Sequence, residues 1–140
     1  MAPSIKQPDI DLYTRAKDVL DESYSPYSNF AVGAAVRSAE GEVFTGVNVE
    51  NASYGLSMCA ERTAVFKAIS EGKQNLASLA VAAEDDQPAS PCGACRQVMH
   101  EFNSEMRVIY GPTQKNLTVR SLAEMIPDSF GPDSVQSPSD

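Results

Sequence analysis

The sequence predicts an α/β protein, a three-layer α/β/α sandwich in which helices cover a mixed central β-sheet. Helical and strand patterns alternate along the chain in the order α-β-β-α-β-α-β-α. A continuous apolar run at 76–83 is typical of a strand that is buried on both faces. The 140 residues, of which 42% are hydrophobic, are enough to bury one core. We therefore expect a single domain over residues 1–140, with its core at about 9–130.

The first half of the chain predicts a helix, a hairpin and a loop. Asp9 is expected to be the N-cap of the first helix, whose apolar residues recur at helical spacing up to Leu20. The stretch 25–29, with its proline and serines, ends this region. Residues 31–37 and 43–49 predict two strands joined by a turn at 39–42. The polar, turn-rich stretch 48–55 predicts a loop at the rim of a site.

The second half predicts two longer helices, two strands and a short final helix. The second helix is expected at 57–71, with Gly72 in the C′ position just past its end. Pro91 is expected to start the third helix, which runs to about 102, because proline is tolerated in a first turn. The run at 76–83 and the segment 107–110 are predicted as strands, and 119–126 as a short helix stopped by Pro127. Residues 131–140 predict a mobile tail.

Charge and cysteine content exclude several classes of protein. Lysine and arginine number 11 and aspartate and glutamate 19, so the net charge is 11 − 19 = −8. This acidic balance argues against binding to nucleic acid or to an anionic membrane. Three cysteines, an odd number, do not suit a disulfide framework. Residues 1–11 lack the apolar segment of a signal peptide, and no apolar run approaches the roughly 18 residues of a membrane helix. We expect a soluble, cytoplasmic protein with reduced thiols.

All three cysteines are predicted to lie at helix N-termini, which favours a zinc site. Cys59 comes near the start of one predicted helix, and Cys92 and Cys95 near the start of another. The positive end of a helix dipole stabilises thiolates, and three thiolates suit tetrahedral zinc with one position left for water. A redox pair and inert buried cysteines are the alternatives. His100 lies five residues past Cys95 and points away from it, so it is expected to be a partly exposed helix residue.

Glu61, two residues after Cys59, is a candidate proton carrier. Zinc lowers the pKa of a bound water towards 7, and a nearby carboxylate can accept that proton and pass it to a leaving group. Taken alone, Glu61 reads as a solvated glutamate that complements the helix dipole. Residues i and i+2 do not share a helix face, so the site would have to lie end-on to the first turn.

The pattern Cys-x-Glu followed by Pro-Cys-x-x-Cys resembles the zinc nucleobase deaminases. Flanking blocks narrow the resemblance to the small homotetrameric cytidine deaminases with three cysteine ligands. These blocks are Ser-Pro-Tyr-Ser-Asn-Phe at 25–30, Asn-Val-Glu-Asn-Ala-Ser-Tyr at 48–54, Cys-Ala-Glu-Arg-Thr-Ala at 59–64, Pro-Cys-Gly-Ala-Cys-Arg-Gln at 91–97, and the ending at 122–132. The resemblance covers about residues 16–132. The segment 107–119 departs from it, because many relatives carry a fuller hairpin-like stretch there.

The resemblance implies hydrolysis of cytidine and 2′-deoxycytidine to the uridines and ammonia, as in pyrimidine salvage. One Zn²⁺ per subunit would be held by Cys59, Cys92 and Cys95, and a hydroxide on the zinc would attack C4 of the base. Glu61 would deprotonate the zinc water and then protonate N3 and the leaving ammonia. A deaminase of another aminopyrimidine compound and a catalytically silent zinc scaffold are the rival functions. A polynucleotide-editing deaminase is disfavoured by the charge of −8.

The resemblance also implies substrate-binding residues, some of them shared between subunits of a homotetramer. Asn48 and Glu50 would hydrogen-bond the ribose hydroxyls. The other implied contacts to substrate come from the side chain of Phe30, the backbone of Ala60, and, reaching a neighbouring subunit's pocket, Tyr54 and Phe130.

Arg62 resembles the arginine that hydrogen-bonds the zinc thiolates. Three thiolates and Zn²⁺ sum to −1, and a guanidinium on the sulfurs would withdraw part of this charge.

Overall fold

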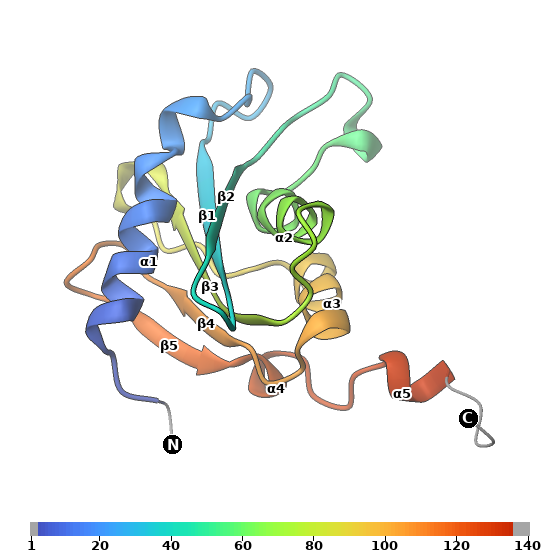
Figure 1. Ribbon diagram of the computed structural model, residues 1–140. Helices are drawn as coiled ribbons and strands as arrows, with labels where there is room; N and C mark the ends of the chain where they lie inside the picture. The colour runs from blue at the N-terminus through green and yellow to red at the C-terminus, as the bar shows by residue number, and fades with distance from the viewer. Residues whose placement is uncertain (1–2, 136–140) are drawn as a thin grey trace.

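A five-stranded mixed β-sheet lies at the centre of the computed structural model, which describes residues 3–135 (Figure 1). The strands are arranged in the order β2-β1-β3-β4-β5. The pair β3–β4 is parallel, and the other neighbouring strands are antiparallel. Their bounds are β1 Val32–Ser38, β2 Val43–Val47, β3 Leu76–Ala83, β4 Arg107–Tyr110 and β5 Thr118–Ser121.

Helices cover both faces of the sheet and make two separate cores (Figure 1). Helix α1 (Gln7–Asp18) packs on one face, where Leu12, Tyr13 and Ala16 are fully buried. Helices α2 (Ala60–Ser70) and α3 (Gly93–Phe102) pack on the other face, over the larger core. This arrangement confirms the predicted three-layer sandwich. The remaining elements are short: η1 Leu20–Glu22, η2 Tyr54–Leu56, η3 Glu84–Asp86, α4 Leu122–Met125 and α5 Pro132–Val135.

Two glycines let the helices approach the sheet closely. A Cβ on Gly33 of β1 would collide with the backbone carbonyl oxygen of Ala16 in α1. A Cβ on Gly46 of β2 would collide with the backbone nitrogen of Ala64 in α2. The close approach of α2 to the sheet fixes the position of its N-terminus, which carries part of the site described below.

Several predicted boundaries are confirmed and others are wrong. β3 and β4 have the predicted bounds, and Gly72, with φ 88°, occupies the C′ position after α2. The predicted helix at 119–126 is wrong: residues 118–121 form β5, which pairs with β4 in a hairpin, and only 122–125 are helical. The helices predicted to begin at 57 and at Pro91 begin later, at 60 and 93. Half of the mobile tail predicted at 131–140, residues 136–140, lies outside the described residues, and residues 132–135 form the short helix α5. No helix within 3–135 is both long enough and apolar enough to span a membrane.

The prediction that Asp9 is the N-cap of α1 is wrong, because Lys6 is the N-cap, but Asp9 does cap the helix from its first turn as part of a capping box. The Asp9 carboxylate accepts hydrogen bonds from the Lys6 backbone N–H, at 2.8 Å, and from Arg107 Nε, at 2.8 Å. It also forms an ion pair with Arg107 Nη2 at 2.7 Å. Asp9 thus ties the start of α1 to β4, across 98 residues of sequence.

Replacing Asp9 with asparagine is expected to destabilise the fold by about 2–3 kcal/mol at pH 7. Burial alone raises the pKa of Asp9, but the Arg107 and Lys6 hydrogen bonds and the Arg107 charge hold it below 3.8. A lowered pKa in the folded state means that this stability is present above pH 3.8 and is lost as the pH falls through the folded-state value. Urea unfolding at several pH values measures this loss, with exposed Asp18→Asn on the same helix as the matched control. An equal effect of the two substitutions at pH 7 would contradict the role given to the ion pair.

Candidate active site

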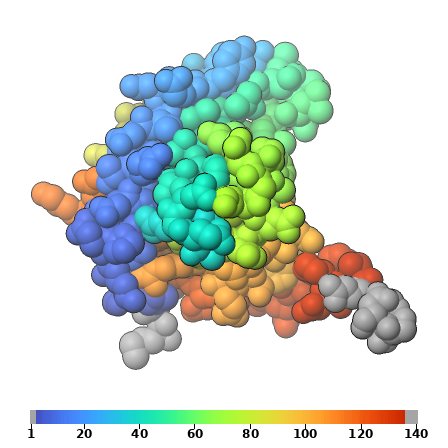
Figure 2. All heavy atoms as spheres, viewed as in Figure 1, coloured from blue at the N-terminus to red at the C-terminus, as the bar shows by residue number. Residues whose placement is uncertain are grey.

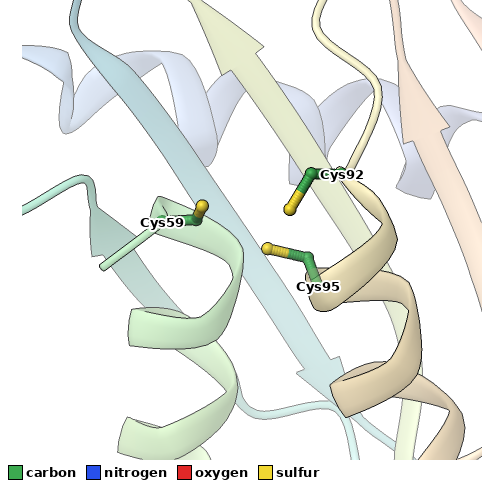
Figure 3. A group of neighbouring side chains, drawn as sticks. All are labelled: Cys59, Cys92 and Cys95. Carbon is green, nitrogen blue, oxygen red and sulfur yellow. The ribbon is translucent and has the colours of Figure 1, made fainter. Parts of the chain in front are cut away.

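Three cysteine sulfurs meet between the N-termini of α2 and α3 (Figure 3). Cys59 is the N-cap of α2, Cys92 is the N-cap of α3, and Cys95 lies in the first turn of α3. The three Sγ atoms lie within 4.8 Å of one another and point toward a common centre. Both helices direct their free N–H groups and positive dipole ends toward this cluster, which stabilises thiolates. The predicted position of the cysteines at two helix starts is therefore confirmed.

The cluster already favours an ionised thiol before any metal binds. A hydrogen bond from Cys95 and a second from Arg62 lower the pKa of Cys59 to about 5, while the pKa of Cys95 is raised. Arg62 Nη2 donates to Cys59 Sγ at 3.3 Å, and this bond in turn raises the pKa of Arg62. The buried Nε of Arg62 has no hydrogen-bond partner among the described residues. Arg62 thus places a positive charge directly on the sulfur cluster.

Glu61 lies beside the cluster and is 5% exposed. Burial, together with the negative charge of Cys59, raises the pKa of Glu61 to about 7. A carboxyl group with this pKa can both accept and release a proton near neutral pH. The solvated glutamate that Glu61 suggests when read alone is therefore excluded.

A cavity of about 290 Å³ opens onto this centre. Glu61, Cys59 and Cys92 all line it, so the cavity lies end-on to the first turns of the two helices. The remaining lining residues are Val32, Asn48, Glu50, Ser57, Met58, Ala60, Val81, Ala89 and Ser90. Glu61 and the thiols can therefore act on one small molecule.

Asn48 and Glu50 line the cavity, and both also hold the loop at 23–32. Asn48 Oδ1 accepts from the Val32 backbone N–H at 3.0 Å, and Nδ2 donates to the Phe30 carbonyl at 2.8 Å. Glu50 accepts from the backbone N–H groups of Tyr27 and Ser28, both at 3.0 Å. The Ser28 hydroxyl and these N–H groups lower the pKa of Glu50, so its carboxylate is ionised at the mouth of the cavity.

The three aromatic residues expected to contact substrate do not line this cavity in the described structure. Phe30 is half-buried, and Phe130 is 63% exposed. Tyr54 is 74% exposed and packs edge-on against Tyr27, with ring centroids 6.0 Å apart. The loops around 24–30 and 49–56 lie side by side at one end of the molecule (Figure 2). Next to the first cavity, Tyr27, Ser28 and Tyr54 line a second one of about 300 Å³ together with Glu50 and Ser57.

Sequence reasoning missed several residues that shape the site. Ser28, which anchors Glu50, lies in a block quoted for its resemblance, but nothing in the block reveals this bond. Met58, Ala89 and Ser90 flank the cysteines and line the cavity. Their position next to the ligands is the only sequence feature that could have singled them out.

The cluster fits a zinc ion with an open fourth position. Three thiolates from two helix N-termini form a soft donor set of the kind that zinc prefers. His100, the single histidine of the chain, instead contacts Ser129, 3.1 Å from its Nε2. Three protein ligands beside a buried carboxylate are the arrangement of a catalytic zinc centre. Because these residues come from a Cys-x-Glu and a Pro-Cys-x-x-Cys motif, the centre is of the zinc-dependent nucleobase deaminase type.

Comparison with known proteins identifies the family. Residues 6–112 match the family model described as the cytidine and deoxycytidylate deaminase zinc-binding region. The cytidine deaminase of Halalkalibacterium halodurans is 45% identical over 120 residues, which cover 85% of this chain and 91% of the relative. The cytidine deaminase of Mycobacterium tuberculosis is 41% identical over 129 residues, which cover 90% of this chain and 94% of the relative. The crystal structure of cytidine deaminase from Burkholderia pseudomallei superposes with a TM-score of 0.82 at 44% identity, covering 90% of this chain and all of the other. The chain therefore belongs to the cytidine deaminase family; it is an enzyme whose cofactor is one Zn²⁺ per subunit, held by the cysteine cluster.

Proposed function

We propose that this enzyme hydrolyses cytidine and 2′-deoxycytidine to uridine and 2′-deoxyuridine, with release of ammonia, in cytoplasmic pyrimidine salvage. The observation that carries the proposal is that buried Glu61 and the sulfur cluster share one cavity of about 290 Å³. The family membership of the chain supports the choice of cytidine as substrate.

Glu61 is the proton carrier in this proposal. Zinc, when bound by Cys59, Cys92 and Cys95, lowers the pKa of water and so supplies a nucleophile at neutral pH. Glu61 takes one proton from the water that adds to C4 and passes it to N3. It then takes the proton of the C4 hydroxyl and passes it to the amino group, which leaves as ammonia while the C4 carbonyl forms. A pKa near 7 suits both directions of transfer. Arg62 offsets the charge of the thiolates and keeps the centre electrophilic.

The other cavity residues orient the nucleoside. The backbone of Ala60, at the N-terminus of α2, offers hydrogen bonds to the base. Glu50 and the second N–H of the Asn48 amide bind the ribose hydroxyls, because both side chains line the cavity. Their hydrogen bonds to the loop at 23–32 leave these groups free to bind substrate as well. Phe30, held by Asn48 through its carbonyl, packs against the pyrimidine from the loop at the cavity edge.

The charge of the two cavities favours a nucleoside over a nucleotide. Among the described residues that line them, the acidic side chains are the carboxyl groups of Glu50 and Glu61 and the thiols of Cys59 and Cys92, and neither lysine nor arginine occurs. A 5′-phosphate would meet a carboxylate and no cation, which opposes binding. We therefore expect kcat/KM for cytidine to exceed that for cytidine 5′-monophosphate by about 100-fold or more. An ultraviolet assay with both substrates measures this ratio, and equal turnover would contradict the proposed substrate class.

We also propose a homotetramer in which neighbouring subunits complete each cavity. Large apolar side chains are exposed near the cavity mouth: Tyr24, Tyr27, Val49, Tyr54 and Leu56. Exposed apolar groups gathered around a site favour burial against another protein surface. Phe130 lies outside the cavity of its own chain, which suits a role in a neighbour's. Light scattering should give a native mass near four times 15.0 kDa. A fully active monomer would contradict the shared sites.

A further inference from the structure

The segment that carries Phe130 follows α4 and lies against one face of α3. The Phe130 side chain is 63% exposed, whereas Gly131 beside it is buried. Asp128 adopts φ 53°, in the left-handed region, so the chain turns sharply just before Phe130. An exposed ring on a turn needs a fixed backbone if it is to occupy one orientation.

Side chains of α3 supply that fixation at three points. Arg96 Nη1 donates to the Met125 carbonyl at 2.8 Å, at the start of the segment. Gln97 Nε2 donates to the Phe130 carbonyl itself at 2.7 Å. His100 Nε2 lies 3.1 Å from Ser129 Oγ. These three residues, at positions i, i+1 and i+4, lie on one side of the helix.

His100 and Gly131 also fit each other closely. A Cβ on Gly131 would collide with His100 Nε2 and lie 2.7 Å from its Cδ2, and the nearest atoms to it all belong to this imidazole. The ring therefore packs directly on the Gly131 backbone, where any side chain would displace it.

The helix that holds this segment is also the helix that carries two zinc ligands. Arg96 Nε donates to the Pro91 carbonyl at 2.7 Å, next to Cys92. One side chain thus bonds both the turn that bears the ligands and the start of the Phe130 segment. The position of Phe130 is in this way fixed relative to the cysteine cluster through α3.

We propose that Gln97 and His100 are positioning residues that hold Phe130 in the orientation in which it contacts substrate in a neighbouring subunit. The inference rests on the proposed role of Phe130. Neither residue lines the cavity of about 290 Å³, so both act through the Phe130 backbone and its neighbours. Plain packing of the segment, without effect on substrate, is the alternative that the experiment must separate.

Steady-state kinetics with cytidine tests the proposal through four variants: Gln97→Met, Gly131→Ala, Phe130→Ala and the double variant Gln97→Met with Phe130→Ala. Gln97→Met removes the bond to the Phe130 carbonyl, and Gly131→Ala displaces the His100 ring. Each is expected to raise KM about threefold to tenfold, the scale of one hydrogen bond, with kcat within about twofold of the wild type. Glu101→Gln, an exposed position on the same helix, is the control. Zinc content and native mass should match this control.

The double variant separates positioning from packing. If Gln97 acts through Phe130, adding Gln97→Met to Phe130→Ala raises KM no further. A further rise of the same size, or an unchanged KM in both Gln97→Met and Gly131→Ala, would overturn the inference while leaving the role of Phe130 intact. An unchanged KM in Phe130→Ala would overturn the proposed role of Phe130 and this inference with it.

Discussion

Replacing Glu61 with glutamine is expected to lower kcat for cytidine by about 10²–10⁴-fold, the range of a lost general acid–base group. Glutamine keeps the shape of the side chain but cannot accept a proton. Zinc should remain at one ion per chain, because the three sulfurs that hold it are unchanged. Kinetics and metal analysis of the same sample make the test, and near-normal turnover with full zinc would remove Glu61 from the chemistry.

The same substitution should stabilise the metal-free protein at neutral and alkaline pH. The pKa of Glu61 is raised from 4.5 to about 7 by burial, so ionising it opposes folding. A raised pKa gives stability that is present below pH 4.5 and is lost as the pH rises through about 7. Above that pH the glutamine variant should be more stable than the wild type by about 3 kcal/mol. Chemical unfolding at pH 5 and pH 8 compares the two proteins; a less stable variant at pH 8 would show that the loss of activity includes structural damage.

Replacing Cys92 or Cys95 with alanine is expected to abolish stoichiometric zinc binding and with it almost all turnover. Each change removes one of three thiolates, and two sulfurs hold zinc far more weakly than three. Cys95 is fully buried, so its loss also costs core packing, whereas Cys92 is exposed. Cys92→Ala is therefore the cleaner variant: in metal-free form its thermal midpoint should equal that of the metal-free wild type.

Metal analysis after dialysis against a mild chelator measures the effect on zinc. Ala94→Ser, in the turn between the two cysteines, is the matched control and should keep one zinc per chain. A cysteine variant that also kept one zinc per chain would show that its sulfur is not a ligand.

The parts of this enzyme that could be predicted from sequence depend on local pattern. The apolar run of β3 and the position of the cysteines at helix starts are both set by neighbouring residues. The zinc site could be predicted for the same reason, because the Cys-x-Glu and Cys-x-x-Cys motifs each lie within one helical turn.

What could not be predicted depends on contacts between distant residues. β5 is a four-residue strand that exists because it pairs with β4, and its sequence Thr-Val-Arg-Ser, with one apolar residue, is too short to show a strand pattern. Ser28 reaches Glu50 across 22 residues, and Gln97 reaches Phe130 across 33. No periodicity encodes such bonds. Asp9 was predicted as the N-cap, whereas α1 begins three residues earlier in the chain and Asp9 bonds the backbone N–H of the N-cap Lys6. The hydrogen bond from the distant Arg107 holds the Asp9 carboxylate in this position.

Stepwise addition of Zn²⁺ to the metal-free enzyme, with cytidine as substrate, tests the central claim most directly. Absorbance follows the conversion of cytidine, and uridine and ammonia are quantified at the end. We predict that activity rises in proportion to bound zinc and saturates at one ion per chain, with equal amounts of uridine and ammonia formed. Undiminished turnover of cytidine without zinc, or no turnover at one zinc per chain, would contradict the account.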